Sequence, residues 1–327
     1  MTLRRRQLIT LLGGAAAWPL AVRAQQQVPM IGYLGTESPS LFARQVHAFH
    51  QGLAELGYIE SRNVTIEYRW AEGRVDRLEP LAADLVNRRV ALIATSTDPA
   101  ARAAKAATTS VPIVYLSAND PVATGIIASL AHPGGNVTGV TSLNNDLVAK
   151  RVELLRELAP QATSAAFLIN PNNSEVAERT TKDAQIAAHR LGFDLHVVHA
   201  SGEPDLDLAF EKVRALQTAG LVVNTQAFFN LRHKRIAALG LRYSVPTVFN
   251  YREFAAAGGL MSYGGSNTDG WRLVGVYAGR ILRGDRPGDL PFQQETRIEL
   301  IINMKTAKAL GLTVPPSLLG RADEVIE

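Results

Sequence analysis

Short β-branched runs alternate with longer amphipathic segments from Val28 onward. This alternation is typical of βαβ units and predicts parallel sheets covered by helices. In the first half the predicted strands are Met30–Leu34, Val64–Tyr68, Leu92–Ala94 and Ile113–Leu116. The predicted helices cover 41–56, 78–88 and 122–130, and an alanine-rich helix begins near Pro99. We expect a doubly wound sheet of order 2-1-3-4-5, which puts the second strand and Trp70 at its edge.

The glycine-rich stretch His132–Thr141 is predicted to be a turn, and the same pattern restarts after it. The predicted strands of the second half are Ala165–Ile169, Asp194–Val198, Leu221–Asn224, Thr247–Phe249 and Leu260–Tyr263. Its predicted helices are 145–158, 175–191, 207–217, 229–243 and 253–257. A helix 268–282, an extended stretch 292–302 and a short helix 305–310 follow. Because no low-complexity linker separates the halves, we expect two packed α/β lobes joined by short hinges.

The first 24 residues have the features of an export signal. Three arginines, Arg4 to Arg6, precede an apolar run, and small residues end at Ala24. The pair Arg5-Arg6 fits the twin-arginine pattern, although an ordinary Sec signal is the alternative. The apolar run is too short to span a bilayer. We therefore expect cleavage after Ala24 and a periplasmic protein.

Charge and cysteine content exclude several classes of function. The chain has 34 Lys+Arg and 30 Asp+Glu, and the signal contains four of the arginines, so the mature protein is neutral. Binding to nucleic acid requires a clustered positive excess, so no nucleic-acid partner is expected. The chain contains no cysteine, which excludes disulfides, thiolate catalysis, iron–sulfur clusters and a lipid anchor at the cleavage point.

Polar side chains gather where the predicted strands end. In an open α/β sheet, ligands bind beyond the carboxyl ends of the strands, near helix N-termini. We predict that these loops of both halves meet around one small solute. The predicted ligand-binding residues are Leu34, Gly35, Thr36, Thr95, Ser96, Thr97, Asn119, Asp120, Thr141, Ser142, Asn170, Asn172, Asn224, Thr225, Gln226, Tyr251 and Tyr263.

The chemistry of these loops suits a zwitterion. Helix N-termini can hold a carboxylate, and Asp120 or Glu37 can receive an ammonium group. Ser96 is predicted to contact the solute, whereas Asp98 is predicted to cap its helix. Taken singly, each loop is better explained as connecting structure with helix capping, and only the loops taken together favour a ligand site.

Signatures of catalysis or metal binding are absent from the sequence. The glycine clusters lack the Lys-Ser/Thr of a phosphate loop, and no Gly-x-Ser-x-Gly elbow occurs. His196 and His199 lie three apart on a predicted strand, so they point to opposite faces and cannot share a metal ion. We expect no catalytic residue, no metal and no cofactor.

Several short motifs together resemble the ABC transporter substrate-binding proteins of the tryptophan-binding type. They lie at 5–16, 31–34, 51–58, 68–73, 120–122, 133–140 and 256–264. The resemblance implies a type I periplasmic-binding-protein fold, in which two Rossmann-like lobes enclose a cleft. It also implies three hinge crossings, placed near 141–144, 263–267 and 290–293. On this basis residues 28–142 plus about 265–290 form the N-terminal lobe, and residues 143–264 plus about 291–327 form the C-terminal lobe.

The expected function is capture of a small, amino-acid-like solute and its delivery to an inner-membrane ABC permease by a monomeric protein. Two alternatives stay open on the sequence alone. One is a ligand-sensing module for a membrane receptor. The other is a small-metabolite enzyme on the same scaffold, because a fold does not fix a function.

Overall fold

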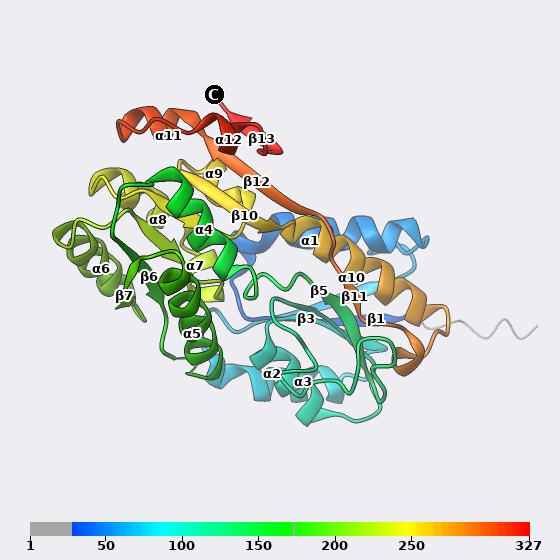
Figure 1. Cartoon of the computed structure of the whole chain (residues 1–327). Helices are drawn as coiled ribbons and strands as arrows, with labels where there is room; N and C mark the ends of the chain where they lie inside the picture. Colours follow the sequence, from blue (N-terminus) through cyan, green and yellow to red (C-terminus); the bar gives the residue numbers. More distant parts are fainter. Residues whose placement is uncertain (1–27, 173) are drawn as a thin grey trace, which may run out of the picture.

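The computed structural model describes residues 28–172 and 174–327. Its chain forms two α/β lobes, each with one central sheet (Figure 1). The predicted signal, residues 1–24, lies outside the described residues. No helix in the described ranges is long and apolar enough to cross a membrane.

The first lobe contains a parallel sheet of order β11-β5-β4-β3-β1-β2. Its strands are β1 (Met30–Gly35), β2 (Thr65–Trp70), β3 (Leu92–Ser96), β4 (Ile113–Ser117), β5 (Val137–Thr141) and β11 (Gln293–Gln294). This confirms the predicted order 2-1-3-4-5, with β2 at one edge. The short strand β11 is added at the other edge.

Helices cover both faces of the first sheet (Figure 1). On one face α1 (Pro39–Glu55) packs along α10 (Asn267–Leu282), and on the other α2 (Leu78–Asn87) packs on α3 (Asp98–Ala107). The spacing of apolar residues in α1 puts Phe49 and Leu53 into the core with Trp271 of α10. A short 3₁₀ turn, η1 (Val75–Arg77), precedes α2, and another, η2 (Pro287–Asp289), follows α10.

The second lobe contains a seven-stranded sheet of order β13-β12-β10-β9-β8-β6-β7. These strands are β6 (Ser164–Ile169), β7 (Asp194–His199), β8 (Leu221–Val223), β9 (Thr247–Phe249), β10 (Met261–Gly265), β12 (Ile298–Asn303) and β13 (Glu324–Ile326). All pairs are parallel except β10 with β12. That pair is antiparallel because β12 enters directly from the first lobe. The predicted parallel sheet thus has one antiparallel pair, at the strand that returns from the first lobe.

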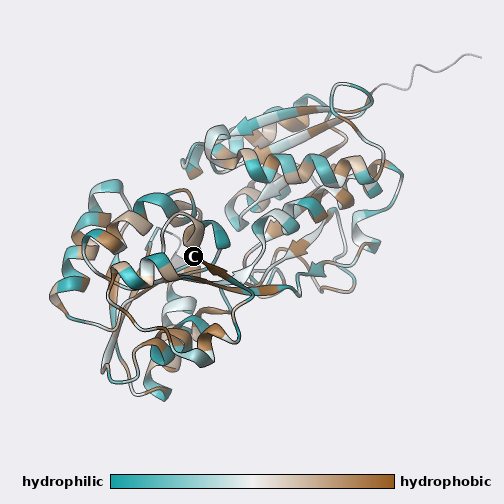
Figure 2. Ribbon diagram, turned by 90° about the horizontal axis from the view of Figure 1, so that it is seen from above, coloured by the Kyte–Doolittle hydropathy of each residue, from teal (hydrophilic) through white to brown (hydrophobic). Residues whose placement is uncertain are grey.

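Two helical layers bury the second sheet. One layer consists of α4 (Val148–Leu158), α5 (Ser174–Arg190), α11 (Met304–Ala309) and α12 (Pro316–Leu319). The other consists of α6 (Glu203–Ala215), α7 (Ala227–Asn230), α8 (His233–Arg242) and α9 (Arg252–Ala256). Figure 2 shows the two lobes beside each other, with hydrophobic residues concentrated in the strands.

Three predicted elements are wrong. Residues 122–130 form turns instead of a helix, because Gly125 takes a left-handed φ of 69° and interrupts helical geometry. The predicted helix 229–243 is divided into α7 and α8. The glycine-rich stretch is not only a turn, because it ends in the strand β5. There Gly139 packs so closely on β4 that a Cβ would lie 2.0 Å from the carbonyl oxygen of Tyr115. The elements α12 and β13 were not predicted.

Three crossings connect the lobes. The first joins β5 to α4 and the second joins β10 to α10, both near the predicted positions. The third lies at 295–297, later than the predicted 290–293, because Gln293 and Gln294 pair with Val140 and Thr141 in the first sheet.

Side chains hold the three crossings together. Asn144 Oδ1 of the first crossing accepts hydrogen bonds from Gly265 N at 3.0 Å and from Arg151 Nη2 at 3.3 Å. In the third crossing, Glu295 Oε1 accepts a hydrogen bond at 2.7 Å from Ser266 N, which belongs to the second crossing. The close packing requires Gly265, since a Cβ there would lie 2.4 Å from Glu295 Oε2.

Candidate ligand-binding cleft

A cavity of about 530 Å³ opens between the lobes. Loops at the carboxyl ends of β1, β3 and β4 form its first wall, and loops after β6, β8 and β9 form its second. Its volume lies within the range typical of small-molecule sites. The topology therefore brings the carboxyl ends of both sheets to one place, as an open α/β architecture requires.

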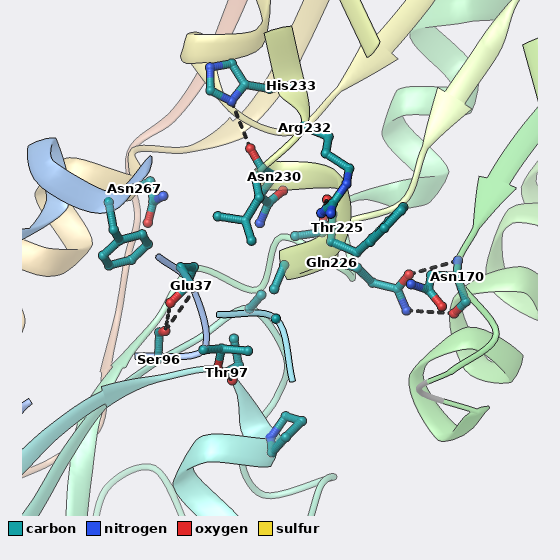
Figure 3. Close-up of a pocket in the computed structure, with 18 of the residues that line it drawn as sticks. Glu37, Ser96, Thr97, Asn170, Thr225, Gln226, Asn230, Arg232, His233 and Asn267 are labelled. Atoms are coloured by element: carbon teal, nitrogen blue, oxygen red, sulfur yellow. Dashed lines mark hydrogen bonds between the residues drawn. The ribbon is translucent and has the colours of Figure 1, made fainter. Parts of the chain in front are cut away.

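Glu37 is the central charged group of the first wall (Figure 3). It is 5% exposed, and Ser96 Oγ donates to its two carboxylate oxygens at 3.3 Å each. Burial raises the pKa of Glu37 to about 7, while hydrogen bonds from its own backbone N–H, from Ser96 and from the Thr36 N–H oppose that rise. A carboxylate with no cationic partner among the described residues thus faces the cavity.

Asp98 is a second buried carboxylate on the same wall. Tyr115 OH and Ser117 Oγ donate to its Oδ1 at 3.1 and 3.3 Å, and Asn119 Nδ2 donates to its Oδ2 at 2.7 Å. Burial raises the pKa of Asp98. The prediction that Asp98 caps its helix is wrong, because α3 has Thr97 as its N-cap residue and no side-chain cap. Asp98 instead organises the ends of β3 and β4.

Thr97 lies between β3 and α3 in an unusual conformation. Its φ is 64°, which is rare for a β-branched residue and marks a strained position. Its hydroxyl lies 2.8 Å from that of Thr36, so the loops after β1 and β3 are joined at the edge of the cavity.

The second wall is built from amides that bind one another (Figure 3). Asn170 N donates to Gln226 Oε1 at 2.9 Å, and Gln226 Nε2 donates to the Asn170 oxygen at 3.1 Å. Thr225 accepts a hydrogen bond from Arg151 Nη1 at 3.3 Å. Arg151 is fully buried, with no carboxylate partner in the described part of the chain, and burial lowers its pKa to about 9.

Aromatic rings form the apolar part of the lining. Trp271 of α10 stacks on Tyr33 at 5.2 Å and meets Phe42 edge-on at 5.3 Å. Across the cavity, Arg232 lies 4.0 Å above the Phe228 ring. The site therefore combines buried carboxylates on the first wall with ring surfaces on both walls.

The structure brings nine of the seventeen predicted site residues to the cavity. These are Thr36, Ser96, Thr97, Asn119, Asn170, Asn172, Thr225, Gln226 and Tyr251. The other eight do not line it: Leu34, Gly35, Thr95, Asp120, Thr141, Ser142, Asn224 and Tyr263.

Local hydrogen bonds and packing explain those eight positions. Leu34 and Gly35 lie within β1, and Thr95 Oγ1 donates to the Leu34 oxygen at 2.7 Å. Asp120 Oδ1 accepts from Val122 N at 2.8 Å and so closes its own turn. The side chains of Thr141 and Ser142 donate to the backbone oxygens of Asn119 and Ser117, and Asn224 donates to Thr180. The backbone oxygen of Tyr263 accepts from Arg151 Nε, and its side chain packs against the core of the second lobe.

Several lining residues were not predicted as site residues. They include Phe42, Gln45, Asn230, Arg232, His233, Asn267 and Trp271. Most lie inside helices, where the sequence shows only an amphipathic pattern, and no local signal separates them from ordinary core or surface positions. Within 28–172 and 174–327, no three His, Asp or Glu side chains converge as a metal site requires.

Two α/β lobes joined by three crossings around a polar cleft define the type I periplasmic-binding-protein fold. The chain belongs to the ABC transporter substrate binding protein family, whose model matches residues 35–326. It is therefore a substrate-binding component of a transporter and not an enzyme.

The chain is similar to individual proteins and solved structures. A tyrosine-binding protein of Clostridioides difficile (strain R20291) is 25% identical over 283 residues, which is 84% of this chain and 79% of that protein. An ABC domain in complex with L-Trp from Streptococcus pneumoniae is 25% identical, with TM-score 0.81 over 91% of this chain and 99% of that chain. A conserved domain protein from Vibrio cholerae has TM-score 0.83 at 23% identity, over 91% and 100% of the two chains.

Proposed function

We propose that this protein captures an amino acid with an aromatic side chain in the cleft and presents it to an inner-membrane ABC permease. The observation that carries the proposal is the buried Glu37 carboxylate, which has no cationic partner among the described residues and lies beside aromatic surfaces in a cavity of about 530 Å³. Tyrosine and L-Trp, named for two relatives, fit that combination. In this arrangement Glu37 takes the role that the sequence assigned to either Asp120 or Glu37.

The capture mechanism follows from the two-walled site. The first wall binds the ammonium group in the open form, and closure then adds the contacts of Thr225, Gln226 and Phe228. A Kd of about 1 μM corresponds to about −8 kcal/mol, so closure must contribute more than the ordering it costs. The permease would recognise the closed shape.

The binding test is thermal unfolding of the exported protein against amino acids, amides, aromatic acids and sugars. A solute that binds the native state alone raises Tm logarithmically with its concentration. We expect L-tyrosine and L-tryptophan to do so. A panel that leaves the melting curve unmoved contradicts the proposed ligand class.

We also propose periplasmic location after twin-arginine export and a monomeric state. Replacing Arg5 and Arg6 together by lysine keeps the positive charge of the signal. Because twin-arginine export reads the arginine pair itself, the double variant should remain uncleaved in the cytoplasm. Normal export of that variant points to the Sec route, and sedimentation of the mature protein tests the monomer.

A further inference from the structure

A buried cation lies directly behind the second wall. Arg151 of α4 is fully buried and has no carboxylate partner in the described part of the chain. Its Nη1 donates at 3.3 Å to the hydroxyl oxygen of Thr225, which lines the cavity (Figure 3). Proteins rarely bury a charge without a counter-charge, because the ion loses its hydration. The guanidinium therefore leaves a positive charge one side chain behind the lining.

Two other hydrogen bonds fix the position of that charge. Arg151 Nε donates to the backbone oxygen of Tyr263 at 2.8 Å, and Nη2 donates to Asn144 Oδ1 at 3.3 Å. Asn144 belongs to the first crossing, and Tyr263 lies in β10, the strand that leads into the second. Because parts of the hinge hold the guanidinium, it needs no rearrangement to act on a solute beside Thr225.

The Thr225 hydroxyl connects this charge to the cavity. An arginine N–H group can only donate, so Thr225 Oγ1 is the acceptor in their bond and keeps its own proton for another partner. Thr225 Oγ1 forms no second hydrogen bond within residues 28–172 and 174–327. A hydroxyl that accepts from a guanidinium is polarised and becomes a stronger donor. It therefore suits an anionic acceptor on the solute.

Two other arginines line the cavity, and both are already paired with carboxylates. Arg232 Nε donates to Glu203 Oε1 at 2.6 Å, and Arg74 Nη2 lies 2.7 Å from Asp76 Oδ2. Both side chains also reach solvent, which screens their charge. Arg151 differs from them in its complete burial and in having no carboxylate partner among the described residues.

From these contacts we propose that the carboxylate of the solute binds at the Thr225 hydroxyl, with Arg151 as the positioning residue that supplies positive charge behind it. This inference rests on the proposed function and deepens it, because it assigns a place to the second charge of a zwitterion. The ammonium group lies at Glu37 on the first wall, and the carboxylate lies at Thr225 on the second. Closure then brings each buried charge of the protein toward the opposite charge of the solute.

The first test compares matched ligands on the native protein by isothermal titration calorimetry. The pairs are L-tyrosine with L-tyrosinol and L-tryptophan with L-tryptophanol. Each alcohol keeps the amino group and the ring but has a neutral hydroxymethyl group in place of the carboxylate. We expect each amino acid to bind at least tenfold more tightly than its alcohol.

The second test locates the carboxylate. Thr225→Val keeps the shape of the side chain and removes its hydroxyl, so the affinity for L-tyrosine should fall about tenfold while that for L-tyrosinol changes less than about twofold. Thr225→Ser should restore the preference for the amino acid. Thr218→Val is the matched control, since that hydroxyl bonds to the Gly220 oxygen and Thr218 does not line the cavity.

A third comparison addresses Arg151 itself. Arg151→Lys keeps the positive charge, whereas Arg151→Met removes it and keeps a long side chain. Thermal unfolding first establishes that each variant is folded. The preference for L-tyrosine over L-tyrosinol should survive in the lysine variant and fall about tenfold in the methionine variant. Loss of folding in both variants leaves the Thr225 variants as the deciding measurement.

Three outcomes would contradict the proposal. Alcohols that bind as tightly as the amino acids overturn this inference and leave the proposed function intact. A preference for amino acids that Thr225→Val retains also overturns it, because the carboxylate then binds other donors of the lining. Those donors include the amides of Asn170, Asn172 and Asn267 and the N–H groups at the starts of α3 and α7. If neither amino acids nor alcohols bind the native protein, the inference and the proposed function both fail.

Discussion

The two walls of the cleft are built from the same kind of strand-end loop, yet they use their polar groups differently. In the first wall, hydroxyls and amides surround two buried carboxylates, Glu37 and Asp98. In the second wall, the backbone of Asn170 and the side-chain amide of Gln226 satisfy one another, and this pair carries no charge. The comparison shows that equivalent loops on two similar sheets need not share a task. We propose that the first wall selects the ammonium charge and that the second supplies shape, closure and the contact with the carboxylate.

Glu37→Gln should have the largest effect, because it removes the charge and keeps the side chain's shape. Loss of one partner from a buried ion pair costs about 3 kcal/mol, so the affinity for an aromatic amine or amino acid should fall about 100-fold. Calorimetry measures the loss, and Glu157→Gln, which breaks a surface pair with Arg321, is the matched control. Unchanged affinity of the Glu37→Gln variant would place charge selection elsewhere and remove the contrast between the walls.

The pH dependence of ligand affinity tests the same difference between the two walls. The pKa of Glu37 in the free protein is about 7, so ionisation of the first wall is lost below neutrality, and affinity for an ammonium ligand should fall about tenfold per pH unit there. Stability of the free protein changes in the opposite direction. Because the folded pKa is raised from 4.5, the contribution of Glu37 to folding is full below pH 4.5 and is lost as the pH rises through 7.

Titrations between pH 5 and 8, paired with unfolding of the free protein, measure both trends. Glu295 also contributes to the stability trend, because burial raises its pKa to about 7 as well. Glu37→Gln should abolish the pH dependence of binding and leave the Glu295 part of the stability trend. A flat binding profile in the native protein would mean that Glu37 does not carry the charge recognition.

A smaller effect is expected on the second wall. Gln226→Ala removes two neutral hydrogen bonds to the Asn170 backbone, each with a net value of about 1 kcal/mol, and loosens the loop after β6. Affinity should decrease about fivefold, equally for amines and amino acids, as judged by calorimetry. Gln51→Ala on the exposed face of α1 is the control. A loss as large as that of Glu37→Gln would mean that the second wall also binds the ammonium group.

The smallest effect concerns a contact between the lobes. Arg179 of α5 donates to Asn119 Oδ1 of the first wall at 2.9 Å and to Asp146 Oδ1 at 2.6 Å, without lining the cavity. Partly exposed ion pairs contribute little, so Arg179→Ala should weaken binding two- to threefold, mainly through faster dissociation from the closed form. Stopped-flow measurements separate the two rates, with Arg280→Ala at an exposed pair as control. A change in the association rate alone contradicts a role in closure.

Much of the fold was predictable because its signals are local. The β-branched runs and the helical spacing of residues such as Phe49 and Leu53 determine which segments become strands and helices. The errors occurred where distant packing decided the outcome. Gly139 belongs to a strand because β4 lies against it, and the crossing after β11 moved because Gln293 and Gln294 found β5 as a partner.

The candidate site was predictable only in outline. Polar residues at strand ends indicated which loops form the two walls. Asp120 and Glu37 are nevertheless equivalent in the sequence. Only the folded loops direct Glu37 to the cavity, while Asp120 closes its own turn. Trp271 gave no local signal, because it reaches Phe42 and Tyr33 only when α10 returns to the first lobe.

The sequence by itself thus determined the two α/β lobes, the strand order of the first sheet and the polar strand-end loops between the lobes. Each of these depends on periodicity and turn chemistry along a few neighbouring residues. Only the tertiary structure decided which polar groups of these loops remain available to a solute. That outcome depends on hydrogen bonds between residues far apart in the chain, such as Ser96 with Glu37 and Gln226 with Asn170, which satisfy some polar atoms and leave others facing the cavity.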